Sequence, residues 1–175
     1  MKSSRRGFDC DKQAKYDFTA STFNYWNCNT GVTFWEVDKT GHLVPFGDEN
    51  ASKTSKADVV IIYDDKIVYI VELKERDCTS TRYASEGAFI NPEKLEFMKK
   101  QQAKGYVPLW GELYTDGIIR LWNLNTMDLD SLTCTTKAIK RYDIYEGERI
   151  MQKRYLLPTA AAVEYERIND EQRYS

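Results

Sequence analysis

Hydrophobic and polar residues fall into clear blocks in the middle of the chain. Residues 59–63 and 67–71 form two β-branched, apolar runs, and the polar residues at 64–66 separate them. This pattern predicts a β-hairpin, because β-branched and aromatic residues favour strands and a short polar interval favours a turn. Neither run shows regular polar alternation, which is typical of strands that are covered on both faces of a sheet.

The flanking patterns predict the other elements. Asparagine, proline and glutamate at 91–93 are typical of a helix start, and the helix is expected to end near Gly105. An Asp-Gly pair at 116–117 favours a hairpin between strands at 107–114 and 118–124. The remaining expected elements are a helix at 11–26, hairpins at 32–37 with 43–46 and at 138–145 with 149–157, and a short strand or helix at 160–167.

These elements predict a single α/β domain over residues 1–175, with a mixed central β-sheet flanked by helices. Its core is expected at about 11–124, and residues 137–167 are expected to add a C-terminal β-hairpin. A chain of this length buries roughly 70% of its unfolded surface, so no stapling is required. The 4 cysteines lack the spacing of a zinc site or a disulfide framework, which favours reduced thiols.

Charged residues flank the central hairpin. Asp58 directly precedes its first apolar run and Glu72 directly follows the second, while Lys74 lies two residues beyond Glu72. The two-residue period of a strand puts Glu72 and Lys74 on one face. Two carboxylates at strand ends suit a hard cation such as Mg²⁺, and an adjacent ammonium suits the charge of a phosphodiester undergoing hydrolysis. A second interpretation is that these are ordinary solvated charges at strand ends.

Asp58, the thirteen intervening residues and then Glu72-Leu73-Lys74 resemble the motif of the PD-(D/E)XK nuclease superfamily, with Ala57 in place of its proline. The order of a polar loop, a helix and two strands after Lys74 is similar to the superfamily's restriction-endonuclease-like αβββαβ core. The resemblance covers about residues 58–124 and is closest to small phage or Holliday-junction-resolvase-like members.

The resemblance implies a metal-dependent endonuclease that hydrolyses DNA, including branched DNA, with Mg²⁺ or Mn²⁺ as cofactor. Asp58, Glu72 and the Leu73 carbonyl would be the metal ligands, and Lys74 the catalytic cation. A resolvase-like member is expected to form a homodimer, because a four-way junction offers two symmetric cuts. The opening helix of the superfamily often carries a glutamate, for which Asp17 is the nearest substitute in this chain.

Two auxiliary residues come from the segment after the motif. Lys94 shares a predicted helix face with Phe97 and Gln101, so it points into the site if that face covers the sheet. The polar, Ser/Thr-rich stretch at 75–87 is long enough for a flap, in which Arg82 and Tyr83 are candidates to contact a nucleic-acid strand. The alternatives are a solvated helical lysine and a loop aromatic that covers the edge of the core.

Overall charge does not decide whether the partner is nucleic acid. The chain has 25 basic and 27 acidic residues, a formal net charge of −2, but basic residues interleaved with tyrosines gather near its C-terminal end. Lys140 and Arg141 are the candidate DNA contacts there, and a solvated strand face is the other interpretation. With a single histidine, acid–base chemistry would fall to carboxylates, lysines and metal-bound water.

Two function classes remain open from the sequence. The first is the nuclease described above, and the alternative is a catalytically inactive nuclease-fold module that binds nucleic acid or a protein partner. The N-terminal segment has basic residues with no apolar stretch after them, and no run is long enough to span a bilayer. We therefore expect no membrane partner and a cytoplasmic location, which is the host cytoplasm for a phage protein.

Overall fold

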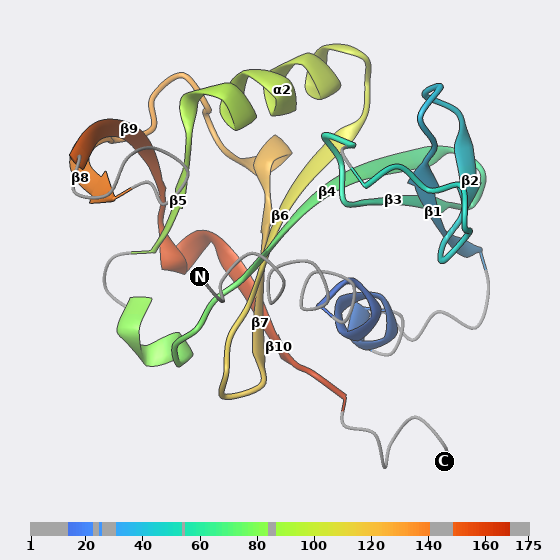
Figure 1. Ribbon diagram of the computed structural model, residues 1–175, viewed down its shortest axis with the longest axis horizontal. Coiled ribbons are helices and arrows are strands. Elements are labelled where there is room, and N and C mark those ends of the chain that lie inside the picture. The colour runs from blue at the N-terminus through green and yellow to red at the C-terminus, as the bar shows by residue number, and fades with distance from the viewer. Residues whose placement is uncertain are drawn as a thin grey trace.

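The protein is a mixed α/β fold built on two β-sheets and two helices (Figure 1). The computed structural model describes residues 14–22, 25, 31–53, 55–83, 87–140 and 149–168. A seven-stranded mixed sheet forms the centre, and a three-stranded sheet stands beside it. No helix in these described ranges combines the length and apolar character needed to cross a bilayer.

Neighbouring strands of the central sheet are antiparallel, except for one parallel pair. In spatial order its strands are β10 (Ala162–Glu166), β7 (Ile118–Asn123), β6 (Val107–Leu113), β4 (Ile67–Glu75), β3 (Val59–Tyr63), β1 (Val32–Val37) and β2 (Leu43–Pro45). Strands β4 and β6 are parallel, and their connection passes through β5 (Ala88–Ile90) and helix α2 (Pro92–Ala103). Parallel neighbours need such a crossover, because no short turn can join them.

The two helices cover opposite faces of the central sheet. Ala14 and Phe18, from the helix that includes residues 14–22, pack in one buried cluster with Val71 and Leu73 of β4. Met98 of α2 packs in another cluster. Figure 1 shows these two helices on either side of the sheet. Alternate residues of β4 therefore face different helices, which explains why the strand is apolar on both faces.

The β3–β4 hairpin turns through two residues with left-handed backbone. Asp64 and Asp65 have φ angles of 50° and 51°, and the Lys66 amide donates to the Tyr63 carbonyl at 3.1 Å. This conformation matches the right-handed twist of the flanking strands, and aspartate tolerates it better than most residues. The turn sets a register in which Val59 lies opposite Val71.

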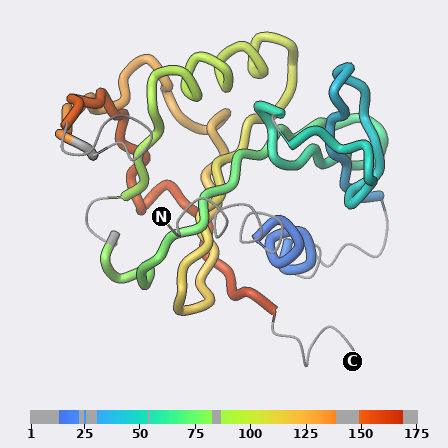
Figure 2. Tube along the Cα trace, viewed as in Figure 1, coloured from blue at the N-terminus to red at the C-terminus, as the bar shows by residue number. Residues whose placement is uncertain are grey.

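The second sheet has the order β5, β9 (Arg149–Leu157) and β8 (Cys134–Lys140), all antiparallel. Its β5 and β9 strands approach closely at Gly87, where an added Cβ atom would lie 2.2 Å from the Leu157 carbonyl oxygen. After β9 the chain crosses back, and β10 pairs with β7 at the edge of the central sheet (Figure 2). Strands β8 and β9 therefore belong to the second sheet, and β10 belongs to the central sheet.

Helix α2 and the hairpins predicted from the segments at 32–46, 59–71 and 107–124 are confirmed. The Asn91 side chain accepts from the Lys94 amide at 2.8 Å, as an N-cap should. The last predicted hairpin differs, because β8 begins at Cys134 instead of residue 138, and residues 141–148 lie outside the described part of the chain. Two further differences concern β4 and β10. Strand β4 continues to Glu75, beyond its apolar run, because it pairs with β6 along that whole segment. The stretch expected as a strand or helix at 160–167 is a strand of the central sheet, preceded by a 3₁₀ turn, and is not part of an added hairpin.

Candidate functional site

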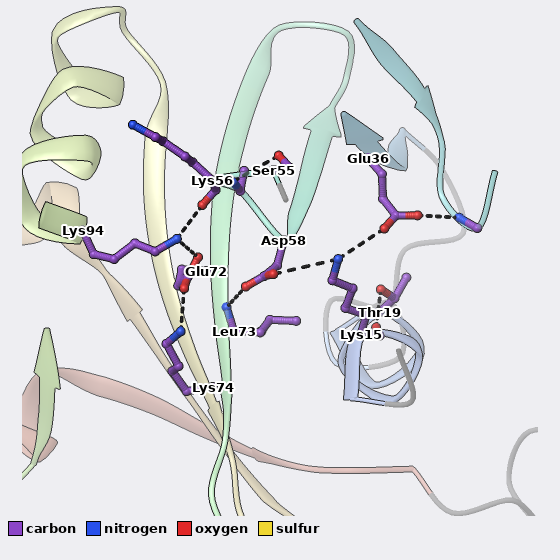
Figure 3. A network of polar contacts seen from close by, with 12 residues as sticks. Lys15, Thr19, Glu36, Ser55, Lys56, Asp58, Glu72, Leu73, Lys74 and Lys94 are labelled. Carbon is purple, nitrogen blue, oxygen red and sulfur yellow. Dashed lines mark hydrogen bonds and ion pairs between the residues drawn. The ribbon is translucent and has the colours of Figure 1, made fainter. Parts of the chain in front are cut away.

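The site begins at a fork between β3 and β4. Strand β3 starts at Val59, opposite Val71, so the later residues of β4 have no β3 residue beside them. The Asp58 side chain lies beside β4 at this point instead (Figure 3). Its Oδ2 atom accepts from the Leu73 amide at 2.8 Å, and its own amide donates to the Val71 carbonyl at 2.9 Å. The Asp58 carboxylate is thereby fixed beside β4 by hydrogen bonds to the backbone.

The Leu73 carbonyl points to the same fork. The amide and carbonyl of one strand residue are directed to the same side, and the Leu73 amide is directed to Asp58. The Leu73 side chain packs into the core below the first helix, which holds this segment in place. Asp58 and Leu73 therefore bring a carboxylate and a backbone carbonyl, both hard oxygen donors, to one place.

Glu72 lies on the other face of β4, with only 3% of its surface exposed. Its Oε1 accepts from Lys74 Nζ at 2.7 Å, and its Oε2 accepts from Lys94 Nζ at 2.6 Å (Figure 3). Lys94 also donates to the Lys56 carbonyl at 2.8 Å, on the loop that leads to Asp58. The sequence predictions that Lys74 shares a face with Glu72, and that Lys94 can point to it, agree with this geometry.

Lys15 supplies a third ammonium, from the first helix. Its Nζ lies 3.4 Å from Oε1 of Glu36 on β1 and 3.9 Å from Oδ1 of Asp58. Glu36 is held in turn by the Gly47 amide, which donates to its Oε2 at 2.9 Å. Lys15 was not among the site residues predicted from the sequence, because a lysine on a helix is usually solvated and nothing in its neighbourhood marks it as different.

The electrostatics of the site are those of two acids held close together. Burial, and then the negative charge of Glu72, raise the pKa of Asp58 to about 6. The Leu73 amide, Lys15 and Lys74 act in the opposite direction, but they do not outweigh these effects. Near neutral pH, an additional positive charge placed between the two carboxylates would therefore stabilise their ionised forms.

The donors fit a divalent cation that is held by few protein ligands. Within the described ranges, no group of three or more acidic, histidine or cysteine side chains surrounds one point. Asp58, Glu72 and the Leu73 carbonyl are thus the available set, and Mg²⁺ commonly binds one or two carboxylates while retaining waters. Burial, and then the charge of Glu72, raise the pKa of Asp58, so a cation bound beside this carboxylate would stabilise its ionised form.

The other predicted site residues lie elsewhere. Asp17 is buried and faces Arg167, 3.5 Å from its Nη1, so it does not join Asp58. Arg82 is exposed in the 3₁₀ turn η1 (Ser80–Tyr83), which Ser80 ties to Asp116 at the β6–β7 turn. The Tyr83 and Lys140 side chains lie outside the described part of the structure, as does Arg141 entirely.

Comparison with known proteins found no relative. No protein-family model, no curated protein and no solved structure matches the chain. The residues around Asp58 and Glu72, and the contacts between them, are therefore the basis for any functional inference.

Proposed function

We propose that the protein is a divalent-metal-dependent endonuclease that hydrolyses DNA phosphodiester bonds at Asp58, Glu72 and Lys74. The observation that carries this proposal is the burial of Glu72 between two lysine ammoniums, beside a second carboxylate. Buried charges of this kind cost stability unless they are well compensated, so they are retained most readily where they perform chemistry. Acids and lysines without histidine suit phosphodiester hydrolysis at a metal site.

Each residue has a distinct part in this proposal. Asp58 and Glu72, with the Leu73 carbonyl, would hold the cation, which when bound supplies Lewis-acid activation of the phosphate and of water. Lys74, whose side chain is 39% exposed, can turn from Glu72 to a phosphate and stabilise its developing charge. Lys94 anchors Glu72 to the loop before Asp58 and so positions the two carboxylates relative to one another.

The order of the elements supports assignment to the PD-(D/E)XK type. A helix, three antiparallel strands (β1, β3 and β4), helix α2 and the parallel strand β6 occur in this order, with β2 inserted after β1 and β5 before α2. Strand β4 carries the Glu-Leu-Lys triplet. This agrees with the αβββαβ core that the resemblance implies. Within that class, a phage junction resolvase or repair-type nuclease is the subclass we propose, acting as a homodimer on branched DNA.

Metal binding is testable without any cleavage. Adding 10 mM Mg²⁺, a concentration chosen as about tenfold above a weak Kd near 1 mM, should raise the melting temperature of the wild type by about 3 °C or more. Glu72→Gln should abolish this increase, and Glu96→Gln, an exposed acid on α2, should leave it intact. An equal shift in both variants would show that Mg²⁺ binds elsewhere.

The activity is tested on labelled single-stranded, duplex, flap and four-way-junction DNA in Mg²⁺ or Mn²⁺. Wild type should cut at least one of these, and Glu72→Gln and Lys74→Met should each slow cleavage by about 10³-fold, because each removes a charge that acts on the transition state. Glu96→Gln again serves as the matched control. The preferred substrate would name the subclass, and a wild type that cuts nothing would overturn the nuclease proposal.

One observation favours a second candidate, a non-catalytic module that binds nucleic acid or a protein partner. Both oxygens of Glu72 are already occupied by lysines, and Lys15 lies beside Asp58 where a third acid would complete a metal site. Such a module would bind its partner equally well with and without Mg²⁺. Binding that survives Glu72→Gln, together with no cleavage by the wild type, would establish it.

A further inference from the structure

A groove of about 200 Å³ runs beside the site, between the central sheet and the second sheet. Lys74 of β4, Arg76 directly after β4 and Glu112 of β6 line it on one side. Phe89, Lys137 and Arg154 line it from the second sheet. Gly87 also lines the groove, and its close approach to Leu157 of β9 leaves no room for a side chain at this position. Because Lys74 belongs to both, the groove opens directly onto the Glu72 site.

The groove has an excess of positive charge. Among the lining residues that the structure describes, Glu112 is the only acid, and it is fully buried in an ion pair with Arg76. Lys137 and Arg154 form no ion pair with any acid in the described ranges. They lie on one face of the second sheet, because Lys137 is opposite Gln152 in the register and Arg154 is two residues further along β9.

An aromatic surface lies among these cations. The Arg154 guanidinium carbon stands 5.7 Å from the centroid of the Phe89 ring, and Gln152 accepts from Arg154 Nε at 3.3 Å. Phe89 is only partly buried, although the strand residues on either side of it are buried. An arginine stacked on an aromatic ring is a surface on which nucleic-acid bases stack, with the guanidinium also available to phosphate.

We propose that this groove binds a single strand of nucleic acid and leads its backbone to the Glu72 site. The inference rests on the proposed function for its direction, since it makes Lys74 the point where the bound strand meets the carboxylates. Single-stranded nucleic acid is favoured over duplex because only unpaired bases present a free face to Phe89 and Arg154. Lys137 and Arg154, which lie on one face of the second sheet, then contact neighbouring phosphates of the strand.

The test is fluorescence anisotropy with a fluorescein-labelled 20-nucleotide oligothymidylate in EDTA, so that binding is measured without metal or cleavage. The double variant Lys137→Ala/Arg154→Ala should raise the Kd by about tenfold or more. It should also reduce the slope of log K against log salt by about 1.4, since each phosphate contact to a single strand contributes about 0.7. A blunt duplex of the same length should bind the wild type more weakly than the oligothymidylate.

Two matched variants control for indirect effects. Lys153→Ala removes an exposed cation that neighbours Arg154 but lies on the opposite face of β9, so it should leave the Kd within about twofold. Arg154→Lys retains the charge and should recover most of the affinity that Arg154→Ala loses. An equal loss in Lys153→Ala would indicate nonspecific attraction and overturn the assignment of the groove.

The two proposals fail in different ways. If the double variant binds oligothymidylate like the wild type while cleavage still depends on Glu72, the groove assignment is wrong and the nuclease proposal stands. If binding depends on Lys137 and Arg154 but no substrate is cut, the groove assignment stands and the nuclease proposal is wrong. Tighter binding of duplex than of single strand, lost in the same double variant, would overturn the choice of a single strand.

Discussion

Glu72 and Glu112 are both buried carboxylates on one face of neighbouring strands, but their partners differ in kind. Glu112 is 0% exposed and is bound by Arg76, by Trp110 Nε1 at 3.2 Å and by the Tyr114 hydroxyl at 2.6 Å. Burial and the nearby Glu112 raise the pKa of Tyr114, so its hydroxyl remains a donor. Glu72 instead has two flexible lysine ammoniums and a neighbouring acid.

The comparison of Glu72 with Glu112 shows that burial of a charged side chain does not by itself indicate function. Glu112 is bound by one guanidinium and two neutral, rigid donors, which together satisfy a carboxylate and fix β6 to the segment after β4. The lysines at Glu72 are long and single-point donors, which can exchange their acceptor for a phosphate or yield to a cation. The type of the partners, and not the depth of burial, distinguishes a structural acid from a candidate catalytic one.

The largest expected effect is a contrast in stability between the two matched substitutions. Glu112→Gln should lower the free energy of unfolding by about 3 kcal/mol, because it leaves the Arg76 charge without its carboxylate. Glu72→Gln should change it by less than about 1 kcal/mol, since Lys74 and Lys94 can turn to water and Asp58 loses a repulsive neighbour. Urea unfolding at pH 7.5 measures both, and equal losses would remove the distinction between the two acids.

Substitution of Asp58 is expected to change the free energy of unfolding in a way that depends on pH. Its pKa is raised from 3.8 unfolded to about 6 folded, so the folded state binds the proton more tightly and stability falls as pH rises between these values. Asp58→Asn retains an acceptor for the Leu73 amide and removes the charge. The shift from 3.8 to about 6 is worth about 1.4 kcal/mol per pKa unit, so the variant should be more stable than wild type by about 3 kcal/mol at pH 8.

The same difference in stability should vanish at pH 4 and below, where Asp58 is protonated in the wild type. Thermal melts at pH 4, 6 and 8 without metal measure it. A variant that is stabilised equally at all three values would show that ionisation of Asp58 is not responsible. Asp58→Asn should also abolish cleavage, which would make this position an example of stability given up for function.

The smallest expected effect is on the cleavage rate, and it concerns Lys94, which positions Glu72. Lys94→Ala should slow cleavage by about tenfold, equivalent to about 1.4 kcal/mol, because Glu72 loses one charged hydrogen bond but keeps Lys74. Lys99→Ala, on the same helix but paired with exposed Asp130 2.8 Å away, should have no effect. The ratio of the two single-turnover rates is the measurement, and a ratio near one would exclude a role for Lys94 at the site.

The parts of the fold that the sequence predicts are those with local signals. The central hairpin has its polar turn, α2 has Asn91 and Gly105 at its ends, and the β6–β7 hairpin has its Asp-Gly pair. Pairings between distant segments have no such signal. The addition of β10 to the edge of the central sheet and the pairing of β5 with β9 depend on packing of residues far apart in the chain.

The candidate site also contains residues that local sequence signals predict and residues that only distant packing brings together. Glu72 and Lys74 follow from strand alternation, and Lys94 from its place on a helix face, so their proximity could be expected. Lys15 could not, because its approach to Asp58 depends on how the first helix packs across the sheet. The Glu112 network was missed as well, since Glu112 and Arg76 come together only when β6 takes its place parallel to β4.

The two left-handed aspartates of the β3–β4 turn have a consequence for the chemistry of the protein. Their conformation suits an exposed turn of this length, and the length of the turn determines which residues of β4 lie opposite which residues of β3. A turn longer or shorter by one residue would invert every side chain of β4 relative to β3. Glu72 and Lys74 would then face the first helix, and Leu73 would face Lys94 of α2, although no residue of the site had been changed.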